Sequence, residues 1–188
     1  MKIGILGGTF NPVHIGHLIL AEEAREKLCL DRIVFVPANL PPHKDNADIA
    51  EAAFRLKMLK LAIKGNKYFS VSDIETKRQG RSYTIDTLKE FKRKYPSDDF
   101  YFIIGSDLLK YLDAWKDLNV INRMIKFVAA TRPGYPLEKI PAYIQTLKIR
   151  AVDVSGFEVR QCVKEGKSFR YLVPDAVFNF INKKGLYK

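Results

Sequence analysis

The strongest constraint on the fold is an alternation that runs along most of the chain. Short runs rich in β-branched and aromatic residues alternate with longer amphipathic stretches. Runs of the first kind favour strands, and apolar residues at helical spacing favour helices. Strands that alternate with helices usually form a parallel sheet with helical crossovers. The sequence therefore predicts an α/β fold, with residues 1–188 forming a single Rossmann-like, doubly wound domain around a mainly parallel sheet.

The patterns also predict where the elements lie. The predicted strands are Lys2–Leu6, Arg32–Pro37, Tyr68–Ile74, Asp99–Ile104, Ile125–Ala130 and Ile149–Val154. The predicted helices are Ile15–Leu28, Ala52–Ile63, Thr84–Tyr95 and a last one from about Pro174 to Lys184, which Gly185 ends. Residues 38–45 contain two consecutive prolines and are expected to form a stiffened loop.

Composition narrows the class of protein. The chain is 47% hydrophobic and 12% aromatic, which is enough for a sizeable core. Its net charge of +11 keeps nucleic-acid binding open, but the basic residues are spread along the chain without a dense run, so we expect no nucleic-acid partner. Cys29 and Cys162 form no CxxC pattern, and no signal-like or membrane-length apolar stretch occurs. We therefore expect a cytoplasmic protein without a membrane partner.

The histidines point to the functional region. The chain has three, His14, His17 and His43, and all lie where the first two predicted strands lead toward helices. In doubly wound folds, ligands bind beyond the carboxyl ends of the strands. The histidines are thus predicted to lie at a ligand site.

The segment from Gly7 to His17 is suited to phosphate. Gly7 and Gly8 allow a sharp turn and a close approach of the backbone to a ligand. The helix that follows offers unpaired N–H groups and the positive end of its dipole. His14 and His17 are three residues apart and share one helical face, with Gly16 leaving space between them. Zinc binding is an alternative for such a pair, but no third Cys or His lies at a useful spacing, and a polar role at a helix start would suit either histidine alone.

His14-Ile15-Gly16-His17 is identified as the motif of the HxGH nucleotidyltransferase superfamily. The motif is shared by adenylyltransferases, cytidylyltransferases and class I aminoacyl-tRNA synthetases, and the synthetases need a longer chain. Further segments, in order and from end to end, resemble bacterial nicotinate mononucleotide adenylyltransferases. They are Gly8–Leu18, Pro37–Lys44, Ser82–Leu88, Ile103–Asp107, Trp115, Arg132–Gly134, Tyr171–Pro174 and Gly185–Tyr187.

This resemblance implies a reaction. The phosphate of nicotinate mononucleotide would attack the α-phosphorus of ATP in line and expel pyrophosphate, without a covalent intermediate. Mg²⁺ would be held mainly by ATP and water rather than by a dedicated protein site. His14 and His17 would be the catalytic residues, donating hydrogen bonds to the triphosphate.

The resemblance also implies two sets of binding residues. Those expected to contact ATP are Gly8, Thr9, Phe10, His14, Gly16, His17, Lys44, Gly105, Ser155 and Arg160. Those expected to contact the mononucleotide are Asn39, Lys44, Thr84, Asp107, Trp115 and Arg132. Simpler roles exist for two of them, since a tryptophan is commonly part of a core and an aspartate at a strand end is commonly a cap.

The chain departs from the family in one segment. Where the family carries two or three consecutive Ser/Thr residues followed by arginine, this chain has Ser155, Gly156, Phe157 and, further on, Arg160. We hypothesise that restoring hydroxyls at Gly156 and Phe157 would lower the Michaelis constant for ATP. The alternatives left open are nicotinamide mononucleotide as the substrate, phosphopantetheine adenylyltransferase activity, a basic nucleic-acid-binding protein, and a homo-oligomeric state.

Overall fold

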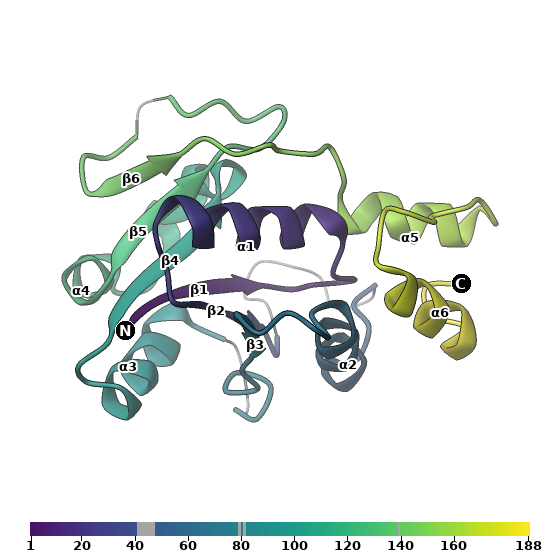
Figure 1. Ribbon diagram of the computed structural model, residues 1–188, viewed down its shortest axis with the longest axis horizontal. Helices are drawn as coiled ribbons and strands as arrows, with labels where there is room; N and C mark the ends of the chain where they lie inside the picture. Colours follow the sequence, from purple (N-terminus) through teal and green to yellow (C-terminus); the bar gives the residue numbers. More distant parts are fainter. Residues whose placement is uncertain (41–47, 79, 81, 139) are drawn as a thin grey trace.

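The apolar runs of the sequence form the strands of a sheet (Figure 1). The protein is described here by a computed structural model, which covers residues 1–40, 48–78, 80, 82–138 and 140–188. Within those residues the sheet has six strands in the order β3-β2-β1-β4-β5-β6, and all neighbouring strands are parallel. The predicted α/β doubly wound fold is confirmed. The strands are β1 (Lys2–Gly8), β2 (Arg32–Pro37), β3 (Phe69–Val71), β4 (Asp99–Gly105), β5 (Lys126–Ala130) and β6 (Ile144–Leu147).

Alternate residues of each central strand face two separate apolar clusters. Ile3 and Ile5 of β1 belong to one cluster and Leu6 to the other. A buried aliphatic side chain contributes about 1.5–3 kcal/mol by leaving water, so each face must be covered. On the Leu6 side, residues of α1 (Ile15–Lys27), α2 (Ala52–Ala62), α5 (Gly156–Lys164) and α6 (Asp175–Lys184) join the cluster. On the other side it is joined by α3 (Thr84–Lys94), the 3₁₀ helix η1 (Ser106–Ala114) and α4 (Leu118–Met124).

The strand order reverses between β1 and β4. β1 pairs with β2 on one side and with β4 on the other, so the connections leave the sheet in opposite directions at this point. Such a switch point opens a crevice at the carboxyl ends of the strands, where ligands bind. Helices α5 and α6 lie beyond the carboxyl end of β1 (Figure 1), and the Ile15 N–H donates to the Leu172 carbonyl at 3.0 Å. The C-terminal part of the chain therefore lies beside the start of α1.

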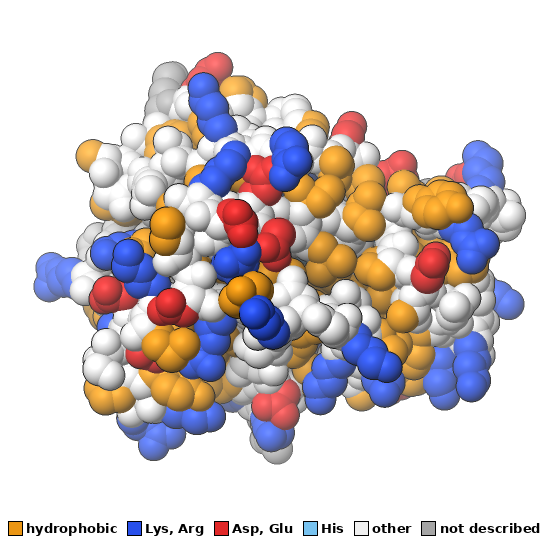
Figure 2. All heavy atoms as spheres, in the orientation of Figure 1, with side chains coloured by type: hydrophobic (Ala, Val, Ile, Leu, Met, Phe, Trp, Pro, Cys, Tyr) orange, Lys and Arg blue, Asp and Glu red, His pale blue; other side chains and the backbone are white. Residues whose placement is uncertain are grey.

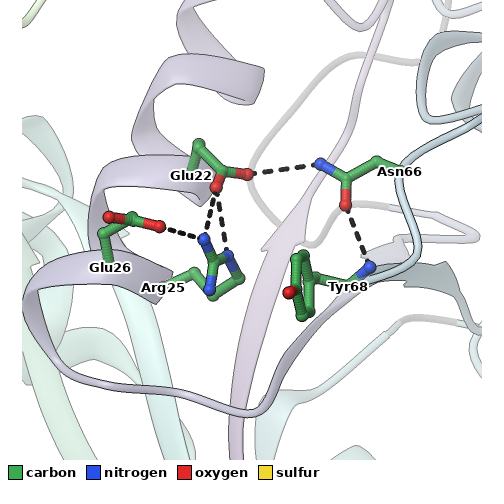
Figure 3. Close-up of polar contacts among 5 residues, drawn as sticks. All are labelled: Glu22, Arg25, Glu26, Asn66 and Tyr68. Atoms are coloured by element: carbon green, nitrogen blue, oxygen red, sulfur yellow. Dashed lines mark hydrogen bonds and ion pairs between the residues drawn. The ribbon is translucent and has the colours of Figure 1, made fainter.

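A polar cluster holds the second half of α1 against the segment that leads into β3 (Figure 3). Glu22 accepts from Arg25 at 2.7 Å and from the side-chain amide of Asn66 at 3.2 Å. The Tyr68 N–H donates to Asn66, and the Arg25 guanidinium lies 4.2 Å from the centre of the Tyr68 ring. These contacts connect the second half of α1 to the residues that lead into β3.

The predicted strand Ile149–Val154 is wrong. The last strand is instead β6, Ile144–Leu147, which pairs with β5. Beyond it, the Ile149 N–H donates to the Thr131 hydroxyl, and the Ala151 and Val154 N–H groups donate to carbonyls two residues earlier. These backbone donors are thus satisfied within the segment and by a side chain. Apolar residues in an extended segment show the same alternation as a strand, which is why the pattern misled.

The other predicted strands and helices are confirmed, with smaller differences, whereas most of the predicted loop 38–45, with His43, lies outside the described residues. β3 is shorter than Tyr68–Ile74, and the helix bounds agree to within a residue or so. Gly185 ends α6 in the left-handed conformation, with φ 60°, as expected for a glycine at that position. Helices η1 and α4 were not predicted, because a 3₁₀ segment and a seven-residue helix are too short or too tightly wound to show a 3.6-residue period. The single-domain interpretation stays a prediction.

The charged side chains do not gather in one stripe on the face that Figure 2 shows. Lys and Arg side chains are interspersed there with acidic and hydrophobic ones. The absence of a nucleic-acid partner stays a prediction. In the part of the chain that the structure describes, no helix combines the length and the apolar character that a membrane span requires.

Candidate active site

The two motif histidines lie together at the start of α1. His14 is the N-cap residue, with φ −137° and ψ 171°, and its backbone N–H donates to Nδ1 of His17 at 3.2 Å. The two ring centres are 3.7 Å apart. The Phe10 ring contacts the His17 ring edge-on at 4.9 Å. The predicted shared face of the two histidines is confirmed, and because α1 follows β1 the pair lies beyond the carboxyl end of that strand, next to the switch point.

Burial sets the charge of His14. The residue is 6% exposed, and its Nδ1 is buried without a hydrogen-bond partner in the described structure. Burial, and to a smaller extent the charge of Arg132, lowers the pKa of His14 to about 4. The imidazole is therefore neutral at pH 7 and carries one N–H donor. It can donate to a phosphate without a proton being lost or gained.

Gly16 and Phe10 pack against the two motif histidines. A Cβ at Gly16 would lie 3.1 Å from His14 Nδ1 and 3.5 Å from Val152, so the glycine lets the His14 ring and residue 152 approach. Phe10 has φ 48° and is only 2% exposed. Its ring lies under Gly8 and beside His17, so a contact of Phe10 with ATP could come only from its backbone.

A second group of predicted residues lies beyond the ends of β4 and β5. Arg132 and Asp107 form an ion pair at 2.8 Å. Gly105 lies against both, because a Cβ there would be 2.5 Å from an Asp107 oxygen and 3.8 Å from Arg132 Cδ. The Ser106 hydroxyl accepts from the Arg132 N–H and donates to the Tyr135 carbonyl. β1, β4 and β5 are parallel neighbours, so this group lies at the same edge of the sheet as the histidines, and the charge of Arg132 contributes to the low pKa of His14.

A third group lies at the start of α3. Thr84 is the first residue of that helix, as predicted. The Lys116 ammonium lies 5.0 Å from the centre of the Tyr83 ring, which brings the Trp115 segment beside the helix start. Trp115 is half-buried and packs edge-on against Phe102 and Phe127 at 5.8 and 6.0 Å. It is thus partly a core residue, and its contact with the mononucleotide stays a prediction.

Asn39 connects the loop after β2 to this third group. Its backbone N–H donates to the Ser82 hydroxyl at 2.9 Å, and its side-chain amide donates to the Arg78 carbonyl at 2.9 Å. A direct contact of Asn39 with the mononucleotide stays a prediction. Lys44, predicted to contact both substrates, lies outside the described residues.

The start of α5 faces the β1–α1 loop. The Ser155 hydroxyl accepts from the Glu158 N–H at 3.1 Å, so Ser155 caps the start of α5. Arg160 donates to the Asn11 carbonyl at 2.8 Å, and its guanidinium lies 5.9 Å from the centre of the Phe157 ring. The predicted ATP residues Gly8 and Thr9 belong to the β1 end of the same loop. This segment therefore lies against the loop that carries the motif histidines, and the guanidinium of Arg160 is partly occupied by the protein itself. Contacts of Ser155 and Arg160 with ATP stay predictions.

Two residues at the site were missed at the sequence level. Arg55 is 1% exposed and donates to backbone carbonyls, and burial lowers its pKa. Asn11 is 8% exposed and hydrogen-bonded through both ends of its side chain. A sign of Arg55 was available, because it lies three and four residues before Met58 and Leu59, on the buried face of α2. A basic residue on an apolar helical face indicates a buried polar partner.

The comparisons with known proteins agree with this geometry. The family model described as cytidylyltransferase-like matches residues 5–162. The "probable nicotinate-nucleotide adenylyltransferase" of a Thermus thermophilus strain is 45% identical over 188 residues, which is 100% of both chains. The chain belongs to this family. A protein of the same name from Exiguobacterium sibiricum is 45% identical over 189 residues, covering 100% of this chain and 99% of that one.

A solved structure shares the fold. The nicotinic acid mononucleotide adenylyltransferase of Plasmodium falciparum, complexed with NaAD, superposes with a TM-score of 0.83. It is 21% identical in sequence, and the alignment covers 99% of this chain and 97% of that one. This likeness independently supports the doubly wound nucleotidyltransferase fold.

Membership of the nicotinate-nucleotide adenylyltransferase family makes the departure at Gly156 informative. A Cβ on Gly156 would lie 2.8 Å from the Asn11 carbonyl oxygen and 3.5 Å from that of Pro12. Both are backbone atoms, so the close approach of α5 to the loop requires a glycine. The hypothesis that a hydroxyl residue at 156 would improve ATP binding is therefore revised.

We expect Gly156→Ser to lower the free energy of unfolding by about 1–3 kcal/mol, as overpacking commonly does, and to raise the Michaelis constant for ATP. Phe157→Thr is the matched control, because its side chain is 63% exposed. The control should change stability by less than about 0.5 kcal/mol. Urea unfolding and ATP titration measure both. A Gly156→Ser protein with unchanged stability and ATP constant would contradict the steric argument.

The low pKa of His14 predicts a loss of stability in acid. The unfolded histidine binds its proton near its ordinary value of 6.5 and the native one near 4, so the unfolded chain binds more protons between these values. Unfolding free energy should therefore fall as pH falls through this window, by about 2 kcal/mol from this residue at pH 5. Urea unfolding at about pH 7 and pH 5, compared between the wild type and His14→Ala, isolates the contribution. An equal loss in both proteins would exclude His14 as the cause.

Proposed function

We propose that the chain transfers the adenylyl group of ATP to nicotinate mononucleotide, giving deamido-NAD and pyrophosphate, a step of NAD biosynthesis. The observation that carries the proposal is the pair His14 and His17 at the N-terminus of α1, at the switch point of the sheet. Full-length relatives at 45% identity that bear the matching name support it.

The arrangement suits a direct displacement. A phosphate oxygen of the mononucleotide forms a bond to the α-phosphorus of ATP as the bond to the bridging oxygen of pyrophosphate breaks. The attacking oxygen is already anionic, so no protein base is required. Positioning and charge stabilisation do most of the work in such transfers. Neutral His14, together with His17, would donate to the oxygens on which charge develops, and the first N–H groups of α1 add to this.

The mononucleotide would occupy the side of the site formed by Thr84, Trp115 and Asn39. Arg132 is close enough to His14 for its charge to lower the pKa of that histidine, so its charge would also act on a phosphate bound nearby. Its ion pair with Asp107 keeps the guanidinium in place while leaving donors free for a ligand.

Mg²⁺ is expected to arrive with ATP. In the described part of the chain, no three His, Cys, Asp or Glu side chains come together as a metal site. Asp107 places a carboxylate at the end of β4, where it could accept a hydrogen bond from a metal-bound water or a ribose hydroxyl. The ion would supply charge neutralisation on the triphosphate. We retain the cytoplasm as the compartment, since Cys29 and Cys162 are both free thiols.

The test is direct. Purified protein is incubated with ATP, Mg²⁺ and nicotinate mononucleotide, and pyrophosphate and the dinucleotide are quantified together. Equal amounts of the two products are expected, with neither formed when the mononucleotide is left out or replaced by phosphopantetheine. Product from phosphopantetheine alone would reassign the activity. Tight, steeply salt-dependent binding to a random DNA duplex would instead favour the nucleic-acid alternative.

A further inference from the structure

The guanidinium of Arg55 joins three loop segments. Nε donates to the Ala50 carbonyl at 2.8 Å, and Nη2 donates to the Asn39 carbonyl at 2.9 Å. Nη1 donates to the Thr9 carbonyl at 2.9 Å and to the Ala38 carbonyl at 2.7 Å. In the described structure no carboxylate pairs with this buried cation. Its partners there are the backbones of the loop after β1, the loop after β2 and the segment that enters α2.

Asn11 reaches the last of these segments from the other side. Its Nδ2 donates to the Asp48 carbonyl at 2.8 Å, and its Oδ1 accepts from the Ala50 N–H at 3.0 Å. The Tyr187 hydroxyl donates to the same Oδ1 at 2.9 Å. The Ala50 residue is therefore held through its N–H by Asn11 and through its carbonyl by Arg55.

These hydrogen bonds connect the loop after β1, the loop after β2 and the segment before α2 into one network. Thr9 and Asn11 are two residues apart in the loop that leads to His14, and both are connected through Arg55 and Ala50. Asn39, on the side assigned to the mononucleotide, is connected to the same guanidinium. Movement of one loop must therefore displace the other or break a buried hydrogen bond.

We propose that Arg55 and Asn11 are a positioning pair. Together they hold the loop after β1, which is assigned to ATP, at a fixed position relative to the loop after β2, which is assigned to the mononucleotide. The proposal rests on the proposed function for its kinetic readout but not for its structural one. Neither residue needs to touch the reacting atoms. Their effect follows from geometry, because a displacement of about 1 Å in a near-attack arrangement costs on the order of 10²-fold in rate.

The kinetic test uses Arg55→Lys, Asn11→Ala and the double variant. Arg55→Lys keeps the charge but loses the fork that reaches several carbonyls at once. We expect each single variant to lower kcat by on the order of 10²-fold, with much smaller changes in either Michaelis constant. The double variant should fall no further than the worse single one, because both residues hold Ala50.

Asp98→Asn is the matched control for stability alone. Asp98 is 9% exposed and accepts from the N-terminal amine at 2.8 Å, at the opposite end of the sheet. Its variant should lose stability and keep the wild-type kcat per folded molecule, with the folded fraction taken from urea unfolding. Effects of the two pair variants that multiply, or that match those of the control, would overturn the proposal.

Hydrogen exchange gives a readout that does not depend on catalysis. The Ala50 N–H is expected to exchange faster in Arg55→Lys as well as in Asn11→Ala, although Arg55 does not contact that N–H. Unchanged Ala50 exchange in Arg55→Lys would overturn the pairing. If Asn11→Ala does not fold, Asn11→Ser replaces it, since its shorter side chain stays polar but loses the amide that reaches Asp48 and Ala50. If the wild type forms no dinucleotide, the proposed function fails and the exchange result alone decides on the pair.

Discussion

Substituting either motif histidine with alanine is expected to lower kcat by about 10²–10³-fold, the usual cost of removing one preorganised donor to a developing charge. His14 is held by burial and by the close fit of Gly16, and His17 by the His14 N–H and the Phe10 ring. Their geometry is therefore set before ATP binds. Steady-state kinetics with ATP and nicotinate mononucleotide measure the loss, and circular dichroism checks the fold.

The two variants differ in what else they remove. Nδ1 of His17 accepts from the His14 N–H, so His17→Ala also weakens the start of α1. Losing such a cap costs about 0.5–2 kcal/mol of stability. His17→Asn offers an acceptor again without an imidazole, so it separates the two effects. A variant at either position that retains wild-type kcat would remove that histidine from the catalytic role.

The second large effect expected is a preference for the acid over the amide mononucleotide. The substrates differ by a carboxylate against a carboxamide on the pyridine ring. Among the described residues no side chain caps the start of α3, so its first N–H groups are available to a ligand, and the Lys116 ammonium lies near them, over the Tyr83 ring. A carboxylate accepts from all such donors, whereas a carboxamide turns its NH₂ toward at least one of them. Each donor left unpaired costs about 1–3 kcal/mol, which is roughly tenfold to a hundredfold in specificity.

Net charge alone would not give this result. Asp86 lies in the first turn of α3 and opposes an anion there, so the discrimination must come from hydrogen bonding. The two mononucleotides are mixed at equal concentration and both dinucleotides are quantified. Equal yields, or an excess of the amide product, would contradict nicotinate mononucleotide as the preferred substrate, while adenylyl transfer would remain the assigned reaction. Asp86→Asn should sharpen the preference, since it removes the opposing charge.

The elements predicted well from sequence are those whose burial is periodic along the chain. β4 is apolar from Phe100 to Ile104 because it is covered on both faces, and α6 shows helical spacing with a glycine stop. The strand misplaced at Ile149–Val154 has an apolar pattern, but hydrogen-bonding partners decide whether an extended segment joins a sheet. One of those partners belongs to Thr131 and cannot be read from the segment itself.

The residues of the site also fall into two groups, those whose positions follow from local spacing and those whose roles depend on distant contacts. His14 and His17 are three residues apart, so their proximity follows from helical geometry. The role of Gly156 depends on the distant Asn11 carbonyl, and that of Arg55 on three separate loops. No local pattern encodes such contacts. Apart from the resemblance to its family, only the placement of Arg55 on a buried helical face gave a sign of them.

The hydrogen bond from Tyr187 to Asn11 joins residues 176 positions apart in the chain. During synthesis the loop after β1 leaves the ribosome early, and Tyr187 leaves only after the whole sheet has been made. Contacts this distant in sequence form late, after the entropy of closing the intervening chain has been overcome. The sheet of the nascent chain can therefore assemble before the loop after β1 receives its hydrogen bond from Tyr187. Turnover of nicotinate mononucleotide should therefore depend on whether Tyr187 has been made, whereas the secondary-structure content should not. A tag joined shortly after Tyr187 would lie beside the loop that follows β1.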